Sequence, residues 1–425
     1  MKVRNATILR ILAVYLLLLS VWSGNCLAKD RLTVHLVSLP PNALKYIREN
    51  VIPAFESQYD CEVTIVSVDW GNRADALMVA TAAGIPPDIF MSGAEHVKEL
   101  VELGLLYCID QEWAEWEDKD DFFPPTLGSS TYDGRRYGVP IYFAPRVWWY
   151  RQHIFDESGL DSSNPPATWS EMLTTVKRLT LIDGDNRVVR QGYDLSRTYP
   201  ADMHAAFQDY IVYLWQAGGE LIDEITRQPL FNTDAGREAL QFMVDLKETV
   251  IPPGTQLAAI GGTGGAFAQG KAAIYFAGPW VPAEVKEVAP GQADDVAAFY
   301  KLAGKGGAYS VVFSDWLGIH SASPNKELAW RFIQALTSPE ALLGMHLHTG
   351  LLAPRRSLMM DFVEEVPASR YLYEGMDYMR AFPPAADSME MREAWYQQYM
   401  EVMEGKKDIS SALAEAALLW SVIAQ

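Results

Sequence analysis

The chain contains 425 residues, of which 49% are hydrophobic and 21% are charged. This length exceeds what one ordinary hydrophobic core covers, so we expect a globular protein with two lobes. The 54 acidic residues outnumber the 35 basic residues, which gives a formal net charge of -19. Such a surface repels the phosphates of nucleic acids, and no basic stripe is visible, so we expect no nucleic-acid partner.

The N-terminus has the pattern of a secretory signal peptide. Three basic residues precede the apolar run 11–19, which is too short to cross a membrane. The small residues Cys26 and Ala28 favour cleavage after Ala28, so we expect residues 1–28 to be removed and the mature protein to be periplasmic. Lipid attachment at Cys26 is the alternative, although Ser23-Gly24-Asn25 is a poor match to the sequence that precedes a lipidated cysteine.

Two cysteines, Cys61 and Cys108, remain after this cleavage. An oxidising compartment permits a disulfide between them, and two buried thiols are the alternative.

Strands and helices alternate in the first part of the mature chain. Strands are predicted at 31–38, 62–68 and 88–91, where β-branched or alternating apolar residues occur. Helices are predicted at 44–55, with a kink or break at Pro53, and at 73–83. This alternation predicts an α/β fold with a mostly parallel sheet covered on both faces.

The same alternation continues in the second half of the chain. Thr168 and Glu171 have the spacing of a capping box, Thr233 is placed to cap the next helix, and Ser323-Pro324 is placed to begin another. Further helices are predicted at 202–217, 235–247, 325–336, 389–403 and 411–424. No long linker separates these elements, so the two lobes must pack closely.

The segment 265–280 contains a near match to a phosphate-binding loop, with Gly265, Gly270 and Lys271 in the required spacing. Ala272 stands where that loop needs a hydroxyl to hold magnesium, and the pair Gly270-Lys271 precedes an apolar strand instead of following one. We therefore interpret this segment as the turn into a buried strand, with Trp280 after its far end.

Nine segments in this order resemble the family 1 extracellular solute-binding proteins of ABC importers, the group that includes maltose-binding protein. They are 84–89, 103–110, 132–140, 147–155, 159–160, 166–171, 265–280, 318–332 and 352–355. The resemblance extends from about residue 31 to the C-terminus. Arg151 stands where the family usually has Asn, which we interpret as a local surface change of little consequence, and Ala353 stands where Leu is commoner.

The resemblance implies a periplasmic-binding-protein-like fold, in which hinge strands join two α/β lobes around a ligand cleft that closes on binding. It places residues 29–139 and about 310–340 in the N-lobe, and about 140–309 and 341–425 in the C-lobe. The chain is expected to cross between the lobes near Val139-Pro140, near 308–311 and near 338–343. The implied partners are a small-molecule sugar and the transmembrane subunits of an ABC permease, through which alone the monomeric protein meets the membrane.

The 13 Trp, 20 Tyr and 16 Phe residues favour a sugar ligand, because the largely C–H face of a pyranose packs well on flat rings. The resemblance implies sugar contacts at nine positions, although each of them also has a structural alternative. They are Asn42, Asp69, Trp70, Glu95, Tyr142, Phe143, Trp280, Trp316 and Arg355. By contrast, Trp148, Trp149, Trp169 and Trp215 are expected in the core.

Two other classes of protein remain open at this stage. A binding protein for a polyamine, an iron complex or a phosphodiester would share the fold, and a secreted carbohydrate-active enzyme would also use carboxylates and aromatic rings. The chain contains no GxSxG, HExxH or CxxC motif, and its seven His residues are scattered. We therefore expect no catalytic residues, no cofactor and no metal site.

Overall fold

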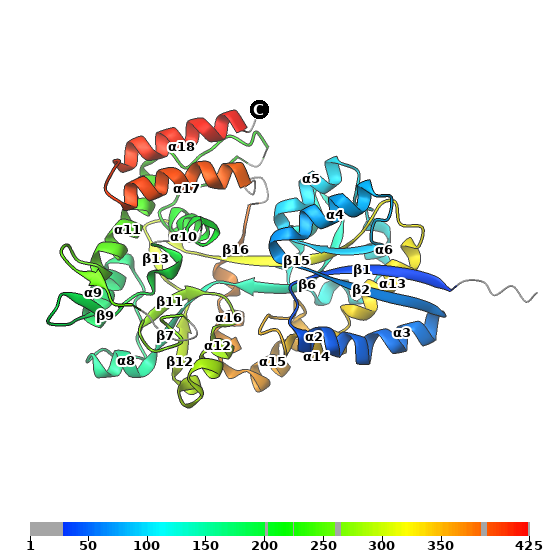
Figure 1. The fold of residues 1–425 in the computed structure, drawn as a ribbon, viewed down its shortest axis with the longest axis horizontal. Helices are drawn as coiled ribbons and strands as arrows, with labels where there is room; N and C mark the ends of the chain where they lie inside the picture. Colours follow the sequence, from blue (N-terminus) through cyan, green and yellow to red (C-terminus); the bar gives the residue numbers. More distant parts are fainter. Residues whose placement is uncertain (1–28, 200–202, 224, 260–264, 384–388, 424–425) are drawn as a thin grey trace, which may run out of the picture.

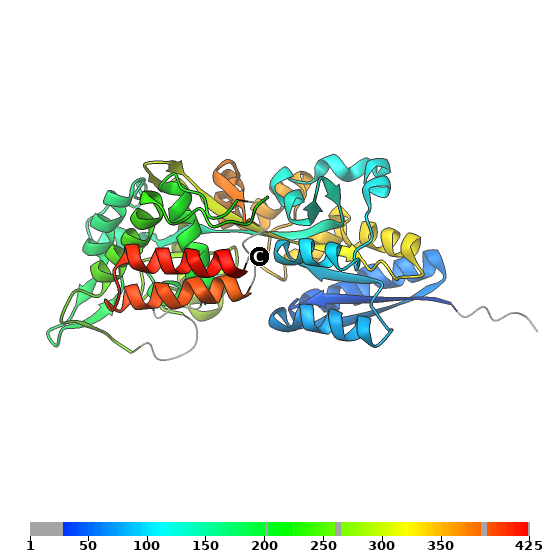
Figure 2. The same cartoon turned by 90° about the horizontal axis from the view of Figure 1, so that it is seen from above.

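The computed structural model describes residues 29–199, 203–223, 225–259, 265–383 and 389–423. The predicted signal peptide and its cleavage site lie outside these residues. Figure 1 shows two lobes side by side, joined in the middle by strands β6 (Gly138–Pro145) and β15 (Ser310–Ile319). Seen from above, the same two strands connect the lobes (Figure 2). The short strand β16 (Met379–Ala381) pairs with β15.

The first lobe contains a six-stranded sheet in the order β16-β15-β3-β1-β2, with β6 also paired to β15. The strand β1 runs parallel to both β2 and β3. Leu32 and Val34 of β1 are fully buried because alternate side chains of the strand face the core. The predicted strands at 31–38, 62–68 and 88–91 are thereby confirmed. The elements of this lobe are β1 (Asp30–Val37), α2 (Pro41–Tyr46), α3 (Ile52–Tyr59), β2 (Cys61–Val68), α4 (Arg73–Ala82), β3 (Ile89–Ser92), α5 (Val97–Glu102), α6 (Asp110–Glu115), α7 (Pro124–Leu127), β4 (Thr131–Tyr132), β5 (Arg135–Arg136), α13 (Lys326–Leu336) and α14 (Pro339–His346).

The helix predicted around Pro53 is continuous in the structure. A π-helical turn at Ile47–Val51 separates α2 from α3 and leaves Pro53 in the first turn of α3. In that position the missing N–H of proline requires no partner within the helix. The widened turn therefore accommodates the proline without ending the helix.

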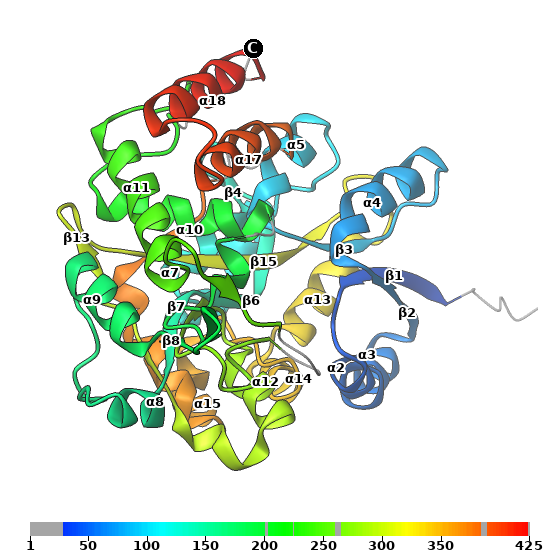
Figure 3. The ribbon, with the colours of Figure 1, turned by 60° about the vertical axis from the view of Figure 1, so that its left-hand side comes forward.

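The second lobe is built on the antiparallel sheet β11-β7-β12. Its core is aromatic: the Trp148 ring stacks on Phe299 at 5.8 Å and lies 4.6 Å from Phe276. The remaining elements are β7 (Val147–Arg151), α8 (Gln152–Glu157), α9 (Trp169–Leu179), β8 (Leu181–Ile182), β9 (Arg187–Arg190), α10 (Met203–Gln216), α11 (Asp234–Val250), β10 (Gln256–Leu257), β11 (Ile274–Ala277), α12 (Val281–Val288), β12 (Val296–Phe299), β13 (Ala303–Gly304), β14 (Gly307–Ala308), α15 (Met359–Glu365), α16 (Arg370–Glu374), α17 (Met389–Met403) and α18 (Ile409–Ile423). Figure 3 shows α17 and α18 packed side by side beyond α10.

Two of the three predicted helix caps are confirmed. The Thr168 hydroxyl accepts from the backbone N–H of Glu171 at 3.3 Å while the Glu171 carboxylate accepts from the backbone of Thr168 at 3.1 Å, which is a complete capping box before α9. Thr233 likewise caps α11. The prediction for Ser323 is wrong, because α13 begins at Lys326 with Asn325 as its N-cap, and the Ser323 hydroxyl accepts from the backbone of Asn325 instead.

The interpretation of Arg151 as a surface change is also wrong. This side chain is fully buried at the end of β7, where its Nε donates to Asp295 Oδ2 at 2.7 Å and its Nη1 donates to the carbonyl of Phe267 at 3.0 Å. Because β7 is the central strand of its sheet, Arg151 connects the core of the second lobe to the turns before β11 and β12. A buried cation in this position is a structural residue.

The hinge strands β6 and β15 form an antiparallel pair along their length. Their register shifts between Asp315 and Trp316, so the regular alternation of faces is interrupted at that point. A third crossing was predicted near 338–343, but these residues begin α14, which packs on α2, with the Tyr46 hydroxyl donating to the Glu340 carbonyl at 3.3 Å. The chain crosses instead between α14 of the first lobe and α15 of the second, and β16 runs parallel to the Ser310–Val312 end of β15.

The two cysteines are free thiols in the structure, with Cys61 buried and Cys108 partly exposed. Among the described residues, no helix combines the length and the apolar character that crossing a membrane requires. Within the same residues, no group of three or more His, Cys, Asp or Glu side chains is arranged to hold a metal ion.

Candidate functional site between the lobes

A hollow lies at the carboxyl ends of the parallel strands of the first lobe. Val37 at the end of β1, Val68 at the end of β2 and Ser92 at the end of β3 line it, together with Arg73 of α4 and His96. Ligands of open α/β sheets bind outside the carboxyl ends of the strands, because loops and helix starts converge there. This edge of the sheet is therefore the part of the first lobe best placed to bind a ligand.

Charged groups from both lobes act on His96. Burial, together with the positive charges of Arg73 and Arg392, lowers the pKa of His96 to about 4. Arg73 belongs to the first lobe, whereas Arg392 lies on α17 of the second lobe and contacts the His204 side chain. His96 is therefore a neutral imidazole at pH 7, within electrostatic range of an arginine of each lobe.

Trp70 and Arg73 form a stacked pair beside this hollow. The Trp70 side chain is 44% exposed, and the Arg73 guanidinium lies 3.9 Å from the centre of its ring. Arg73 Nη1 also donates to the Trp70 carbonyl, at 2.5 Å. Asp69 precedes this pair and is exposed, as is Asn42 at the start of α2. These three predicted residues thus offer polar and aromatic surface at the ends of β1 and β2.

A buried hydrogen bond connects the hinge strands at the centre of the molecule. The Tyr142 hydroxyl donates to Asp315 Oδ2 at 2.6 Å. Burial raises the pKa of Asp315 to about 7, although the hydrogen bond from Tyr142 and the charge of Arg73 both favour the ionised form. Burial also raises the pKa of Tyr142. This pair is a buried group that titrates near neutral pH, at the point where the chain passes between the lobes.

In the second lobe, Trp280 is half-buried at the start of α12. The Arg146 guanidinium lies 4.6 Å from the centre of the Trp280 ring, on the loop between β6 and β7. Behind the ring, the indole of Trp149 donates to the Gly278 carbonyl at 2.9 Å and holds the turn that presents Trp280. The apolar run before this turn is β11, a buried strand as predicted.

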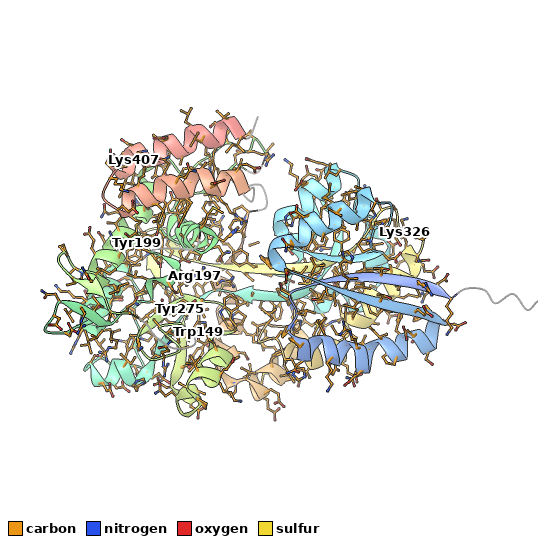
Figure 4. All side chains as sticks on the ribbon, viewed as in Figure 1. Trp149, Arg197, Tyr199, Tyr275, Lys326 and Lys407 are labelled. Atoms are coloured by element: carbon orange, nitrogen blue, oxygen red, sulfur yellow. The ribbon has the colours of Figure 1, made fainter. Side chains whose placement is uncertain are left out.

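A buried ion pair acts on Arg146, the arginine that stacks on this tryptophan. Arg197 donates to Asp209 at 3.0 Å, and burial raises the pKa of Asp209 to about 6. Figure 4 shows Arg197, Tyr275 and Trp149 in the second lobe. The charge of Arg197 lowers the pKa of Tyr275, against the larger effect of burial, which raises it.

A second hollow, of about 250 Å³, contains residues of both lobes. Ser129 lines it from the first lobe, Trp215 and Glu220 from the second, and Arg380 from β16. Arg380 donates to both carboxylate oxygens of Glu220 at 3.0 Å. This hollow includes none of the nine predicted contact residues.

Trp316 is buried in the core of the first lobe. Its side chain has 0% exposure and packs against Phe90, with ring centres 6.1 Å apart, in a cluster with Leu77 and Leu100. We therefore correct the expectation of a sugar contact at Trp316. Because of the register shift, Asp315 faces Tyr142 of the hinge strand β6, whereas the neighbouring Trp316 packs into the core.

Arg355 and Phe143 are likewise buried, so we also correct the contacts expected of them. Arg355 is 1% exposed and pairs with Asp118 and Asp121, each at 3.3 Å, while its Nε donates to the Thr337 carbonyl at 2.7 Å. Phe143 is fully buried, with its ring 5.6 Å from that of Phe123. These contacts account for both side chains as structural residues.

The side chain of Glu95 lies outside the part of the chain that the structure describes. Its backbone belongs to the short 3₁₀ turn Ala94–His96, which follows β3. Sequence reasoning missed Arg73, Arg146 and Asp315. Arg146 and Asp315 are lone charged residues within otherwise apolar hinge segments, and that interruption was the available signal.

Comparison with known proteins agrees with this geometry. A family model described as bacterial extracellular solute-binding protein matches residues 40–342. A binding protein of Brucella abortus (strain 2308) is 26% identical over 291 residues, covering 68% of this chain and 67% of that protein.

Solved structures share the two-lobed fold. A solute-binding protein of an ABC transporter from Thermotoga lettingae, bound with alpha-D-tagatose, has a TM-score of 0.76 and 25% identity over 93% of this chain and 100% of its own. The sugar-binding protein MalE from Xanthomonas citri has a TM-score of 0.79 and 21% identity, over 93% of this chain and 97% of its own. The predicted α/β fold with two lobes is confirmed. Because the family model covers well over half of the chain, this protein belongs to the bacterial extracellular solute-binding proteins.

Proposed function

We propose that this protein is the sugar-binding component of an ABC import system. It binds a saccharide between its lobes, closes about the hinge strands, and delivers the ligand to the transmembrane subunits of the permease. The observation that carries the proposal is the pair of partly exposed tryptophans, Trp70 and Trp280, one on each lobe. The arginines stacked on them, Arg73 and Arg146, both act on Tyr142 of the hinge strand β6. Because each lobe contributes one tryptophan, both rings can contact the same sugar only when the lobes close.

Family and structural relatives support this assignment. The Thermotoga lettingae protein was solved with a bound sugar, and the Xanthomonas citri protein is named a sugar-binding protein. A sugar needs flat rings for its C–H faces and hydrogen-bonding groups for its hydroxyls, since a buried hydroxyl without a partner is costly. The exposed Asp69 and Asn42 are candidates for such groups, and Glu95 and Tyr142, whose buried hydroxyl donates to Asp315, are retained as further candidates.

The mechanism contains no chemical step on the ligand. The protein works as a periplasmic monomer after removal of residues 1–28, without cofactor or metal, and meets the membrane only through the permease. Ligand binding is coupled to closure of the lobes because the hinge strands β6 and β15 run without interruption from one lobe to the other.

A thermal-shift screen of the mature chain tests this proposal. We expect the melting temperature to rise with one class of mono- or oligosaccharide, because a ligand that binds the folded state stabilises it by mass action. Stabilisation by spermidine, Fe³⁺ or a phosphodiester and by no saccharide would reassign the ligand. Turnover of an oligosaccharide during incubation would reassign the protein to a carbohydrate-active enzyme.

A further inference from the structure

Arg146 is a buried arginine in a constrained position. It is 8% exposed and lies between β6 and β7, where its backbone N–H donates to the Val311 carbonyl at 2.9 Å and its carbonyl accepts from the Ser310 hydroxyl at 2.6 Å. Its guanidinium lies between two aromatic rings, 4.6 Å from the centre of Trp280 and 4.8 Å from that of Phe313. The side chain is therefore fixed against the tryptophan that the proposed sugar site uses.

The hydrogen-bonding capacity of this guanidinium is largely unused. Nη1 donates to the Ala144 carbonyl at 2.9 Å. Nε is buried and has no hydrogen-bond acceptor among the residues that the structure describes. A buried polar group without a partner is uncommon, and a buried cation without an anion is more so.

Other buried arginines of this protein each hold a carboxylate. Arg151 pairs with Asp295 at 2.7 Å, Arg197 with Asp209 at 3.0 Å, and Arg355 with Asp121 at 3.3 Å. In the described part of the chain, Arg146 makes no such ion pair. Burial and the nearby charge of Arg197 together lower the pKa of Arg146 to about 9, against the charge of Asp209, which raises it.

Among the described residues, neither Asp209 nor Asp315 forms an ion pair with Arg146. The Asp209 carboxylate already accepts from Arg197, and the Asp315 carboxylate accepts from Tyr142 at 2.6 Å. The pKa of Asp315 is about 7 because the group is buried, so a large share of it is protonated at neutral pH. The charges of Arg73 and Arg146 both lower the pKa of Tyr142, against the larger effect of burial, so both arginines are within electrostatic range of this hydroxyl.

The arrangement is repeated in the other lobe, where the Arg73 guanidinium lies 3.9 Å from the Trp70 ring. Each lobe therefore presents a tryptophan with a cation on one face. A neutral sugar needs only the rings. An acidic sugar uses a ring and a cation together. The face of its pyranose stacks on the ring, and its carboxylate, which projects from the edge of the pyranose, pairs with the cation.

Building on the function proposed above, we propose that the ligand is an acidic saccharide with a uronic-acid unit, whose carboxylate pairs with Arg146 while its ring stacks on Trp280. A carboxylate carries the single negative charge that Arg146 lacks. Its two oxygens match the planar donors of a guanidinium.

The test is a calorimetric titration of the mature chain with matched ligands at low and physiological salt. Galacturonic acid and its di- and trisaccharides are compared with galactose and the corresponding neutral oligomers, and with a sugar phosphate. We expect a uronate to bind about tenfold to a hundredfold more tightly than its neutral counterpart, since a charge-assisted pair contributes at that scale. We expect its affinity to fall as salt rises.

Three variants assign this preference to one side chain. Arg146→Gln should lose the preference for the uronate and retain any affinity for the neutral sugar. Arg146→Lys should keep part of the preference, because the charge remains while the planar donors are lost. The exposed Arg356→Gln is the matched control and should bind as the wild type does. Circular dichroism verifies that each variant is folded, and if Arg146→Gln is not, the wild-type ligand comparison and Arg146→Lys decide.

The outcomes separate this inference from the proposed function. Neutral sugars that bind as tightly as uronates would overturn the acidic ligand and leave the sugar-binding function intact. Binding of the sugar phosphate alone would overturn the proposal that the acidic group of the ligand is a carboxylate. Binding of no saccharide at all would overturn both proposals.

Discussion

The Tyr142 hydroxyl and the Asp315 carboxylate, 2.6 Å apart, join the two hinge strands at the centre of the molecule. Tyr142 belongs to β6 and Asp315 to β15, directly before the register shift between these strands. Any movement of one lobe relative to the other occurs around strands that this hydrogen bond connects. The pair is thus both a structural link and a titratable group between the lobes.

Tyr142→Phe should lower the free energy of unfolding by about 1–3 kcal/mol, because it leaves a buried carboxyl group without its donor. Urea denaturation followed by circular dichroism measures this loss. Tyr59→Phe is a matched control, since that hydroxyl lies on the surface and should change stability by less than about 0.5 kcal/mol. Equal effects of the two changes would contradict the assigned role of Tyr142.

Asp315 should make stability depend on pH in a defined direction. Its pKa is raised by burial from 3.8 to about 7. The folded state therefore retains a proton that the unfolded state has lost, and this contribution to stability, complete below about pH 4, disappears as pH rises to about 7. Relative to the wild type, Asp315→Asn should thus be more stable at pH 8 than at pH 5. Urea denaturation at both pH values measures the difference, and a pH-independent difference would show that Asp315 titrates normally.

Trp280 and Trp316 should respond in opposite ways to the same truncation. Trp280→Ala should weaken ligand affinity by about tenfold or more, since an aromatic stacking surface is lost, with a smaller loss of stability. Trp316→Ala should lower the free energy of unfolding by about 3–5 kcal/mol, because it leaves a cavity in the first lobe. Calorimetric titration and urea denaturation of both variants separate these effects. If Trp280→Ala lowered the free energy of unfolding as much as Trp316→Ala does, Trp280 would also be a core residue.

Arg151→Asn should destabilise the second lobe strongly. The change leaves the largely buried Asp295 carboxylate without its arginine, and breaking a buried pair in this way costs about 3–5 kcal/mol. Arg187→Asn removes an exposed pair with Asp183 and should cost at most about 1 kcal/mol. Thermal denaturation of the two variants under identical conditions compares them, and similar melting temperatures would contradict the structural role of Arg151.

Gly278→Ala should disturb the sugar site without removing any group from it. A Cβ at position 278 would lie 2.2 Å from the Trp280 ring, which would have to move. We expect a loss of ligand affinity close to that of Trp280→Ala. Gly184→Ala is the control, because a Cβ there meets nothing within 4 Å. Unchanged affinity in Gly278→Ala would show that the ring position is not important for binding.

Local rules predicted much of the fold. The alternation of buried residues in β1 follows from strand geometry, and the Thr168–Glu171 capping box is complete because its residues are neighbours in sequence. Ser323 shows the limit of such rules: its hydroxyl accepts from Asn325 and donates to Asp88 of the first lobe, which delays the start of α13. The competing partner lies 235 residues away in sequence.

The candidate site was less predictable, because burial depends on partners that are distant in sequence. Asp315 and Trp316 are adjacent, yet the register shift turns one toward Tyr142 and the other into the core. Arg355 resembles a ligand contact in sequence, and its partners Asp118 and Asp121 are more than 200 residues away. Arg146 was overlooked because nothing in its sequence neighbourhood distinguishes an arginine that holds a carboxylate from one that lacks it.

The most direct test of saccharide binding between the lobes is a titration of the mature protein with a sugar panel, followed by tryptophan fluorescence and by small-angle X-ray scattering. We predict saturable binding of one saccharide class, with a fluorescence change that Trp280→Ala reduces and a smaller radius of gyration in the bound state. A panel that leaves both the fluorescence and the radius of gyration unchanged, while spermidine or Fe³⁺ alters them, would contradict this function.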